Sequence, residues 1–261
     1  MILDHFKLTD RVAVVTGAGR GIGEGIALAY AEAGAHVVCA ARSRDAIEAT
    51  AEGVRSRGRR ALAMPCDVME RAQLEALVQA ALAEFGRIDV LVNNAGGWPP
   101  KPALRTSEKD FEAAFRFNVT SAFLLTRFAA PALAERGEGA IVNISSAAGR
   151  LAQPGFAAYG TAKAALSFLT RNLAAEFAPK VRVNAIAVGS VETQALGSIL
   201  NPELRRRMEE ATPMGRIGRV EDIAACALYL ASPAAGWVTG KVFEVDGGTE
   251  ATNFRMPAAD L

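Results

Sequence analysis

The sequence predicts an α/β fold, a doubly wound parallel sheet with helices on both faces. Short β-branched runs alternate with segments of helical length along the 261 residues. These runs are apolar on both faces, so helices have to cover the sheet from both sides, as βαβ crossovers do. A chain of this length with 51% hydrophobic residues can bury one sizeable core. We therefore expect residues 1–261 to form a single domain.

The elements of this sheet are read in order from the apolar pattern. Strands are expected at residues 12–15, 37–38, 88–92, 140–144 and 181–186. Residues 157–177 carry apolar side chains at helical intervals and are expected to form one helix. Open α/β sheets bind ligands at the carboxyl ends of their strands. The candidate residues that directly follow a strand are Gly17, Ala41, Asp67, Asn94, Ser146 and Val188.

A glycine-rich loop follows the first strand. Residues 16–23 read Thr-Gly-Ala-Gly-Arg-Gly-Ile-Gly and lead into an alanine-rich helical stretch that reaches residue 33. Glycines allow positive φ and close approach of the backbone, and a helix N-terminus offers free N–H groups and a positive dipole end. The spacing of Gly17, Gly21 and Gly23 meets the strict G-x-G-x-x-G dinucleotide fingerprint only approximately. We expect this loop to bind a pyrophosphate.

Tyr159 and Lys163 are four residues apart, so the predicted helix places both on one face. An ammonium about 4 Å from a phenolate stabilises that anion by roughly 4 kcal/mol at an effective dielectric of about 20. That energy would bring a tyrosine pKa of about 10 close to 7. Ser146 is expected to hold the substrate oxygen. A solvated pair on a helix surface is the alternative reading, and the motifs elsewhere in the chain favour an enzyme.

With these motifs the sequence resembles the short-chain dehydrogenase/reductase family, from about residue 9 to about residue 249. The resemblance implies a Rossmann fold and an oxidoreductase in which Tyr159 is the general acid/base, Ser146 polarises the substrate oxygen and Lys163 holds the nicotinamide ribose. It also implies that Asn118 positions a water that relays protons. The alternative for Asn118 is a residue that satisfies backbone groups at a helix kink. The matching pieces, in order, are residues 16–23, Asp67-Val68, residues 93–96, Asn118, Ser146, Tyr159, Lys163 and residues 246–248.

Cofactor preference is predicted from the end of the second strand. An acidic residue there would bind the adenosine ribose hydroxyls of NAD, but the position is Ala41, and Arg42 follows it. Arg42 and Arg20 can make charge-assisted contacts to a 2′-phosphate, so NADP(H) is preferred and NAD(H) remains possible. In the alternative reading Arg42 points to solvent and Ser43 caps the next helix. The expected cofactor-binding residues are Gly17, Arg20, Gly21, Ile22, Gly23, Arg42, Ser43, Asp67, Val68, Asn94, Ala95, Gly96, Tyr159, Lys163, Gly189, Val191 and Thr193.

Asp67 and Thr193 each have a second point to weigh. The resemblance implies that Asp67 contacts the adenine amino group, whereas a plain loop-capping aspartate is the alternative. Thr193 corresponds to a family threonine that contacts the nicotinamide amide or a phosphate. The family often has Pro-Gly after the sixth strand, where this chain has Val188-Gly189. The turn that leads to Thr193 is therefore expected to be less rigid than a Pro-Gly turn.

Substrate contacts are expected from two segments. Prolines stiffen residues 97–102, which could present Trp98 to an apolar ligand or use it as a loop anchor. Residues 190–214 resemble the family's mobile lid, with a core-packing helix as the alternative; the tail, residues 249–261, could cover a neighbouring pocket. The expected substrate-binding residues are Trp98, Ser146, Tyr159 and Leu196. The apolar helical stripe of the lid is Leu196, Ile199, Leu200, Leu204 and Met208.

The substrate class is an expectation from resemblance. Residues 94–97, 100–102, 201–203, 212–213 and 232–238 resemble bacterial 7α-hydroxysteroid dehydrogenases. A hydrophobic, steroid-like secondary alcohol or ketone therefore ranks above an acyl thioester. A 3-oxoacyl-carrier-protein reductase would be expected to carry a basic docking patch near Arg127 and Arg171. A non-catalytic NADP(H) sensor is a further alternative, but it would not need the group of Asn118, Ser146, Tyr159 and Lys163.

Composition argues against other classes of function. The net charge of +1 indicates neither a nucleic-acid nor a membrane partner, and the arginines at 55–60 and 205–207 are expected on solvated faces. Three widely separated cysteines predict reduced thiols, and two isolated histidines predict no metal site. No targeting segment or membrane-length apolar run is seen, which favours a cytoplasmic protein. The stretch from Trp237 to Gly248 resembles the family's subunit-contact strand, so a homotetramer is expected.

Overall fold

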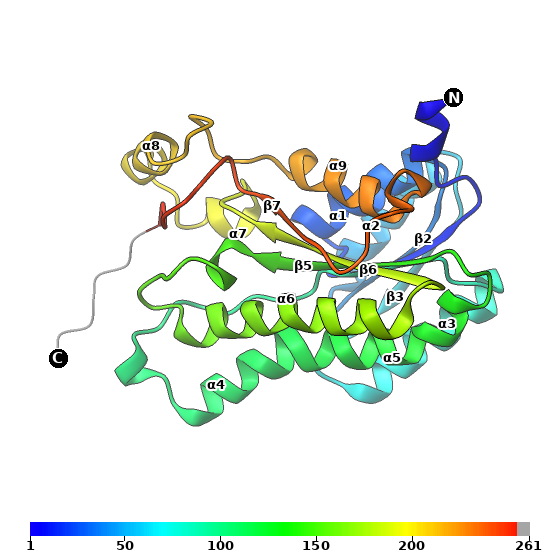
Figure 1. Ribbon diagram of the computed structural model, residues 1–261, viewed down its shortest axis with the longest axis horizontal. Helices are drawn as coiled ribbons and strands as arrows, with labels where there is room; N and C mark the ends of the chain where they lie inside the picture. Colours follow the sequence, from blue (N-terminus) through cyan, green and yellow to red (C-terminus); the bar gives the residue numbers. More distant parts are fainter. Residues whose placement is uncertain (255–261) are drawn as a thin grey trace.

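A seven-stranded parallel sheet forms the centre of the protein (Figure 1). The structure is a computed structural model and describes residues 1–254. The strand order is β3-β2-β1-β4-β5-β6-β7, and every neighbouring pair is parallel. This is the doubly wound sheet that the sequence predicts. The strands are β1 Val12–Thr16, β2 His36–Ala41, β3 Ala61–Pro65, β4 Val90–Asn93, β5 Gly139–Ser146, β6 Val181–Val188 and β7 Val242–Val245.

Helices cover both faces of the sheet and enclose two apolar cores. One core joins the sheet to α1, α2 and α9, and includes Ile26, Ile47 and Ile223. The other joins it to α3, α5 and α6, and includes Leu77 and Leu125. The helices are α1 Gly21–Glu32, α2 Arg44–Arg55, α3 Arg71–Phe85, α4 Glu108–Phe115, α5 Ser121–Ala134, α6 Ala157–Phe177, α7 Gln194–Gly197, α8 Pro202–Glu210 and α9 Val220–Ala231. Short 3-10 helices lie at η1 Ile2–Phe6, η2 Ala103–Arg105, η4 Ala147–Gly149 and η5 Pro233–Ala235, and a π-helix lies at η3 Arg116–Thr120.

Local sequence accounts for the elements that carry the site. All five residues of β1 are buried, as its unbroken apolar run requires of a strand covered on both faces. The helix α6 spans the predicted residues 157–177. Ser43 caps α2 by accepting a hydrogen bond from the N–H of Ala46, as the alternative reading of this position stated. The second strand ends at Ala41, which confirms the position used to argue cofactor preference.

The lid differs from its prediction. The apolar residues between 196 and 208 do not form one helical stripe, because residues 198–201 separate α7 from α8. Thr193 caps the first of these helices, and Asn201 caps the second with Pro202 at its first turn. Met208 is buried, whereas Ile199 is 55% exposed. The prediction of a continuous stripe is therefore wrong: helix-starting residues within the run divide it.

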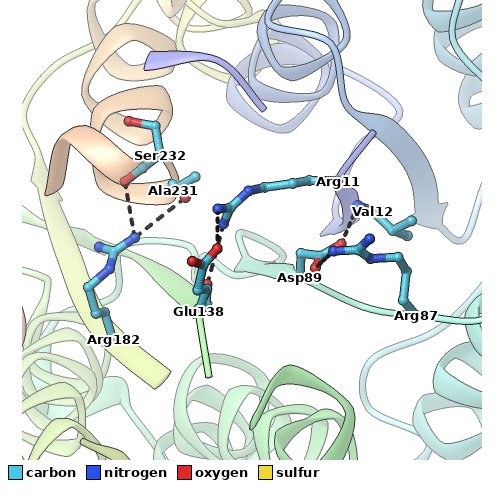
Figure 2. Close-up of polar contacts among 8 residues, drawn as sticks. All are labelled: Arg11, Val12, Arg87, Asp89, Glu138, Arg182, Ala231 and Ser232. Atoms are coloured by element: carbon cyan, nitrogen blue, oxygen red, sulfur yellow. Dashed lines mark hydrogen bonds and ion pairs between the residues drawn. The ribbon is translucent and has the colours of Figure 1, made fainter. Parts of the chain in front are cut away.

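The edge of the sheet opposite the strands' carboxyl ends is held by buried polar groups (Figure 2). Asp89 accepts a 2.8 Å hydrogen bond from the backbone N–H of Val12. Arg182, at the start of β6, donates to the carbonyl oxygens of Ala231 and Ser232 at the end of α9. These contacts join β4 to β1 and β6 to α9. They fix the strands whose other ends carry the candidate site.

The described residues can be compared with the expectations for cysteines, metal sites and membrane spans. Cys39, Cys66 and Cys226 are free thiols, and burial raises the pKa of the Cys39 thiol to about 12. Within residues 1–254, no three His, Cys, Asp or Glu side chains are grouped so that they could hold a metal ion. None of the helices in the described part of the chain has the length and apolar character needed to cross a bilayer.

Candidate active site

Two cavities meet at the carboxyl edge of the sheet. The larger, here called the glycine-loop cavity, has a volume of about 770 Å³ and follows the loops after β1 to β4. The smaller, the lid cavity, has a volume of about 520 Å³ and lies between residues 97–100, the lid and the end of the described chain. Ser146 and Tyr159 line both cavities. A ligand in one cavity can therefore meet a ligand in the other beside these two hydroxyl groups.

The structure brings the predicted site residues together at this place. Every residue predicted to bind the cofactor lines the glycine-loop cavity. Every residue predicted to bind the substrate, including Trp98 and Leu196, lines the lid cavity. Asn118 is the exception, because it lines neither cavity. The roles of these residues remain predictions.

The glycine loop is built so that backbone can approach a ligand closely. Gly17 has a φ of +65°, and a Cβ there would lie 2.6 Å from the Nδ2 atom of Asn94. A Cβ on Gly23 would lie 2.2 Å from the carbonyl oxygen of Gly17. Larger residues are excluded at both positions. The first residues of α1, Gly21 to Gly23, line the cavity, and a helix N-terminus at this place fits the pyrophosphate of a dinucleotide.

Thr16 and Asn94 hold the glycine loop against the next strand. The Thr16 hydroxyl accepts hydrogen bonds from the N–H groups of Asn94, at 3.0 Å, and Ala95, at 3.1 Å. The Asn94 amide donates to the carbonyl oxygen of Thr16 at 2.8 Å. Sequence reasoning proposed Asn94 as a cofactor contact and did not single out Thr16. The only signal for Thr16 was its place between the strand and the first glycine.

Arg20 and Arg42 both line the glycine-loop cavity. Both side chains belong to exposed residues, and within residues 1–254 neither guanidinium forms an ion pair with a carboxylate. Ser43 is used in capping α2, so this part of the alternative reading is also present. The glycine-loop cavity thus holds two arginines, Arg20 before α1 and Arg42 after β2, and no carboxylate at Ala41.

Asp67 keeps both of its predicted readings. Its Oδ1 atom accepts a 3.0 Å hydrogen bond from the N–H of Met69, which is the contact expected of a loop-capping aspartate. The residue also lines the glycine-loop cavity, beside Val68. A loop cap uses one carboxylate oxygen, so the same side chain can hold the loop and still face a ligand.

Tyr159 and Lys163 lie on one face of α6, where Lys163 is buried and Tyr159 is half-buried at the cavities. The Lys163 Nζ atom lies 5.7 Å from the centre of the Tyr159 ring and donates a 2.7 Å hydrogen bond to the carbonyl oxygen of Ile144. Burial lowers the pKa of Lys163 to about 8. Burial also raises the pKa of Tyr159, and the nearby Ser146 hydroxyl acts in the opposite direction. The expectation that Lys163 holds the pKa of Tyr159 near 7 is therefore wrong for this arrangement, because burial is the dominant effect.

Asn118 lies in the π-helix between α4 and α5 and makes a reciprocal pair of hydrogen bonds with Gly97. Its Oδ1 atom accepts from the N–H of Gly97 at 2.8 Å, and its Nδ2 atom donates to the Gly97 carbonyl oxygen at 3.0 Å. The same Nδ2 atom donates to the carbonyl oxygen of Ala114 at 2.9 Å. The side chain thus satisfies backbone groups at a helix irregularity, as the alternative reading stated. It also anchors the loop that carries Trp98.

The lid cavity has an apolar wall. Among the residues that the structure describes, no charged side chain lines it. Sequence reasoning missed the loop after β5 as part of this wall, since it carries no recognisable motif. It expected the tail at a neighbouring pocket, and the described part of the tail lines the lid cavity. The main apolar contributors are Trp98, Leu151, Phe156, Leu196, Met208 and Phe254.

Comparisons with known proteins agree over nearly the whole chain. A family model described as enoyl-(acyl carrier protein) reductase matches residues 17–250. An uncharacterized oxidoreductase of Mycobacterium tuberculosis is 51% identical over 263 residues, which cover 100% of this chain and 100% of that protein. The 7α-hydroxysteroid dehydrogenase of Escherichia coli K12 is 41% identical over 246 residues, which cover 94% of this chain and 96% of that protein.

A solved structure gives the same result at the level of the fold. It is a 7α-hydroxysteroid dehydrogenase complexed with NADH and 7-oxo glycochenodeoxycholic acid. It superposes with a TM-score of 0.92 at 40% identity and covers 95% of this chain and 97% of its own. The sheet, the glycine loop and the Ser-Tyr-Lys arrangement thus occur in a chain whose relatives are named dehydrogenases and reductases. The chain belongs to the short-chain dehydrogenase/reductase family of oxidoreductases.

Proposed function

We propose that the protein is an NADP(H)-dependent enzyme that interconverts a hydrophobic, steroid-like secondary alcohol and its ketone. The observation that carries the proposal is the meeting of the two cavities at Ser146 and Tyr159. One cavity is lined by a glycine loop and a helix N-terminus, which suit a dinucleotide, and the other is apolar. The bound nicotinamide supplies the hydride, and the chain supplies orientation and proton transfer.

The preference for NADP(H) is supported by the charges at the end of β2. Arg20 and Arg42 both line the glycine-loop cavity, and Ala41 takes the place of the carboxylate that would favour NAD. A 2′-phosphate carries about two negative charges and can accept charge-assisted hydrogen bonds from two guanidinium groups. The solved relative is complexed with NADH. NAD(H) therefore remains the competing cofactor in the test.

The chain's own residues have separate tasks in this mechanism. Tyr159 donates its proton to the ketone oxygen, and its raised pKa keeps the phenol protonated at neutral pH. Ser146 holds the same oxygen. Lys163, held by Ile144 at the floor of the site, is the buried cation nearest the phenol ring. In the oxidative direction Tyr159 takes the proton back. Asn118 keeps the loop at Gly97 in place beside this group.

The apolar wall of the lid cavity supports a neutral, bulky substrate. Trp98, Phe156 and Phe254 offer flat surfaces, and the described lining holds no cation that would bind a phosphate or carboxylate within the cavity. A volume of about 520 Å³ falls in the range of ligand pockets, about 300 to 1,000 Å³. The steroid-like ketone is therefore favoured over small polar ketones.

A 3-oxoacyl-carrier-protein reductase is the second candidate, because the matching family model is described by a carrier-protein activity. Such an enzyme would need basic residues where the carrier protein docks. Arg127 on α5 and Arg171 on α6 are both exposed, and neither lines the lid cavity. They are available for docking but are also ordinary residues of helix surfaces.

The test is the change in absorbance of NADPH and NADH, measured in parallel against oxosteroids, an acetoacetyl thioester and simple aryl ketones. Turnover of an oxosteroid with NADPH is the expected result. Turnover of the thioester alone would move the protein to the acyl reductases. Preference for NADH would overturn the assignment of Arg20 and Arg42, and turnover of none of these ketones would overturn the proposed substrate class.

We also propose a homotetramer. β7 is an edge strand of the sheet, and the Trp237 side chain just before it is 100% exposed in the single chain. A fully exposed tryptophan beside an edge strand is typical of a surface covered by another subunit. Light scattering coupled to gel filtration should give four times the mass of one chain, and a monomer would contradict the proposal.

A further inference from the structure

The end of the described chain returns to the lid cavity of its own molecule (Figure 1). Thr249, Thr252, Asn253 and Phe254 all line this cavity. We call residues 249–254 the tail segment. It passes beside α7 and α8, at the red end of the chain in Figure 1. The tail segment and the lid, residues 190–214, thus form neighbouring parts of one wall. The remaining residues of the predicted tail, 255–261, lie outside the described part of the chain.

Asn253 joins the tail segment to both ends of the lid. Its Oδ1 atom accepts a 2.8 Å hydrogen bond from the Ser190 hydroxyl, where the lid leaves β6. Its Nδ2 atom donates a 2.9 Å hydrogen bond to the hydroxyl oxygen of Thr212, just after α8. The Thr212 hydroxyl in turn donates to the carbonyl oxygen of Met208. One amide therefore closes a ring of contacts around a segment of more than twenty residues.

Further contacts fasten the tail segment to the loop that follows β5. Arg150 donates a 2.6 Å hydrogen bond to the carbonyl oxygen of Thr249, and Gln153 donates one of 2.8 Å to that of Phe254. The Phe254 ring lies 6.3 Å from the Phe156 ring in an edge-on arrangement, and Phe156 lies 5.9 Å from the Tyr159 ring. These are ordinary distances for aromatic pairs. A continuous row of rings thus leads from the tail segment to the phenol of the active site.

We propose that Asn253 is a positioning residue that locks the lid against the tail segment, and so holds Met208 and Phe254 in place as a wall of the lid cavity. The lock itself follows from contacts within the chain. Its effect on the choice of substrate rests on the proposed reduction of a bulky ketone. A wall fixed in this way aligns a polycyclic ketone with Tyr159, whereas a small ketone contacts less of it.

The chemistry of the lock requires an amide. The hydroxyl proton of Thr212 is already used toward Met208, so Thr212 can only accept from position 253. The Ser190 hydroxyl is a donor, so position 253 must also accept. Asparagine does both. Aspartate has nearly the same shape but only acceptors. Asn253→Asp therefore keeps the contact to Ser190, and it can bind Thr212 only if the Thr212 hydroxyl gives up its hydrogen bond to the carbonyl oxygen of Met208.

Hydrogen–deuterium exchange of the full-length protein tests the lock without a substrate. Asn253→Asp and Asn253→Ala are compared with the wild type and with Ala251→Ser, a control in the exposed part of the same segment. Asn253→Asp loses one hydrogen bond of this ring and Asn253→Ala loses two. Backbone amides of residues 190–214 should therefore exchange about tenfold faster in Asn253→Asp and faster still in Asn253→Ala, while the strands keep their protection. Exchange in the lid equal to that of Ala251→Ser would overturn the proposal.

Kinetics test the consequence for the substrate. In Asn253→Asp the KM of an oxosteroid should rise about tenfold, while the KM of a small cyclic ketone and the Kd of NADPH stay within about twofold of the wild type. Equal rises for both ketones would overturn the role in positioning. If the wild-type protein reduced no ketone, the proposed function would fail, and the exchange experiment would still decide whether Asn253 locks the lid.

Discussion

The ammonium of Lys163 donates a 2.7 Å hydrogen bond to the carbonyl oxygen of Ile144. Lys163 is 3% exposed, and within residues 1–254 no carboxylate forms an ion pair with it. A carbonyl dipole replaces only part of the hydration that an ammonium loses on burial. Burial therefore lowers the pKa of Lys163 from 10.5 to about 8. Burying this ammonium near Tyr159 therefore costs stability of the folded protein.

This cost predicts a specific dependence of stability on pH. Below pH 8 the lysine is protonated in both states, and above about 10.5 it is neutral in both. Between these values the unfolded state holds one proton more, so this group makes wild-type stability rise with pH by about 3 kcal/mol in all. Urea unfolding of Lys163→Met should lack that rise. Parallel pH profiles for wild type and variant would contradict the prediction.

Tyr159→Phe separates proton transfer from cofactor binding. The raised pKa of Tyr159 keeps the phenol protonated at neutral pH, so the residue is ready to donate in the direction of reduction. Removing the hydroxyl should lower turnover by about 10²- to 10⁴-fold, the usual contribution of a general acid, and leave NADPH binding nearly intact. Steady-state kinetics and fluorescence titration measure the two effects. Tyr229→Phe, on α9, is the control, and an equal loss of binding and turnover would refute this division of roles.

Those parts of the fold that depend on local sequence were predictable. The helix over residues 157–177 follows from its apolar spacing, and the buried strands follow from β-branched runs. The need for glycine at positions 17 and 23 was predictable from the glycine-rich loop, because a Cβ at either position would lie too close to Asn94 or to the carbonyl oxygen of Gly17. Binding of a phosphate by this loop stays a prediction. The lid was predicted less well. Its apolar spacing continues across a break that Asn201 and Pro202 impose by starting a new helix.

Contacts between distant segments could not be predicted. Asn253 meets Ser190 across 63 positions and Thr212 across 41, and no periodicity or motif indicates either contact. The pKa of Tyr159 was also missed, because it depends on burial by the assembled fold rather than on the spacing to Lys163. Residues that act through tertiary contacts leave little trace in local sequence.

Asn118→Ala tests the anchor of the substrate loop. The change leaves the N–H of Gly97 and the carbonyl oxygen of Ala114 without their partner. Two backbone groups without these partners, one of them on the buried residue Ala114, should lower the free energy of unfolding by about 2 kcal/mol. The loop that carries Trp98 should loosen, so kcat/KM for the ketone should fall more than the affinity for NADPH. Chemical unfolding and kinetics check both effects, and unchanged stability would contradict the contacts described.

Arg20→Ala and Arg42→Ala test the cofactor preference. Each charge-assisted hydrogen bond to a phosphate is worth about 1.5 to 3 kcal/mol, so each variant should bind NADPH about ten- to hundredfold more weakly. The affinity for NADH should stay unchanged, because NADH lacks the 2′-phosphate. Arg44→Ala is the matched control: Arg44 is exposed at the start of α2 and does not line the glycine-loop cavity. An equal loss of affinity for NADPH and NADH would show that these arginines contact a part that both cofactors share, and not the 2′-phosphate.

Arg182→Met tests the opposite edge of the sheet (Figure 2). Arg182 donates to the carbonyl oxygens of Leu230, Ala231 and Ser232, where α9 ends, and burial lowers the pKa of its guanidinium. Cations stabilise helix C-termini, and the freed carbonyls would lose charge-assisted partners, so the variant should unfold about 2 kcal/mol more easily.

The same variant separates stability from function, because these contacts lie at the end of β6 remote from both cavities. NADPH affinity and KM should equal those of the wild type at a temperature where both proteins are folded. Arg136→Met, at an exposed arginine after α5, is the control and should change neither quantity. If Arg182→Met were as stable as the wild type, the free-energy cost of burying the Arg182 charge would equal the stabilisation gained by capping α9.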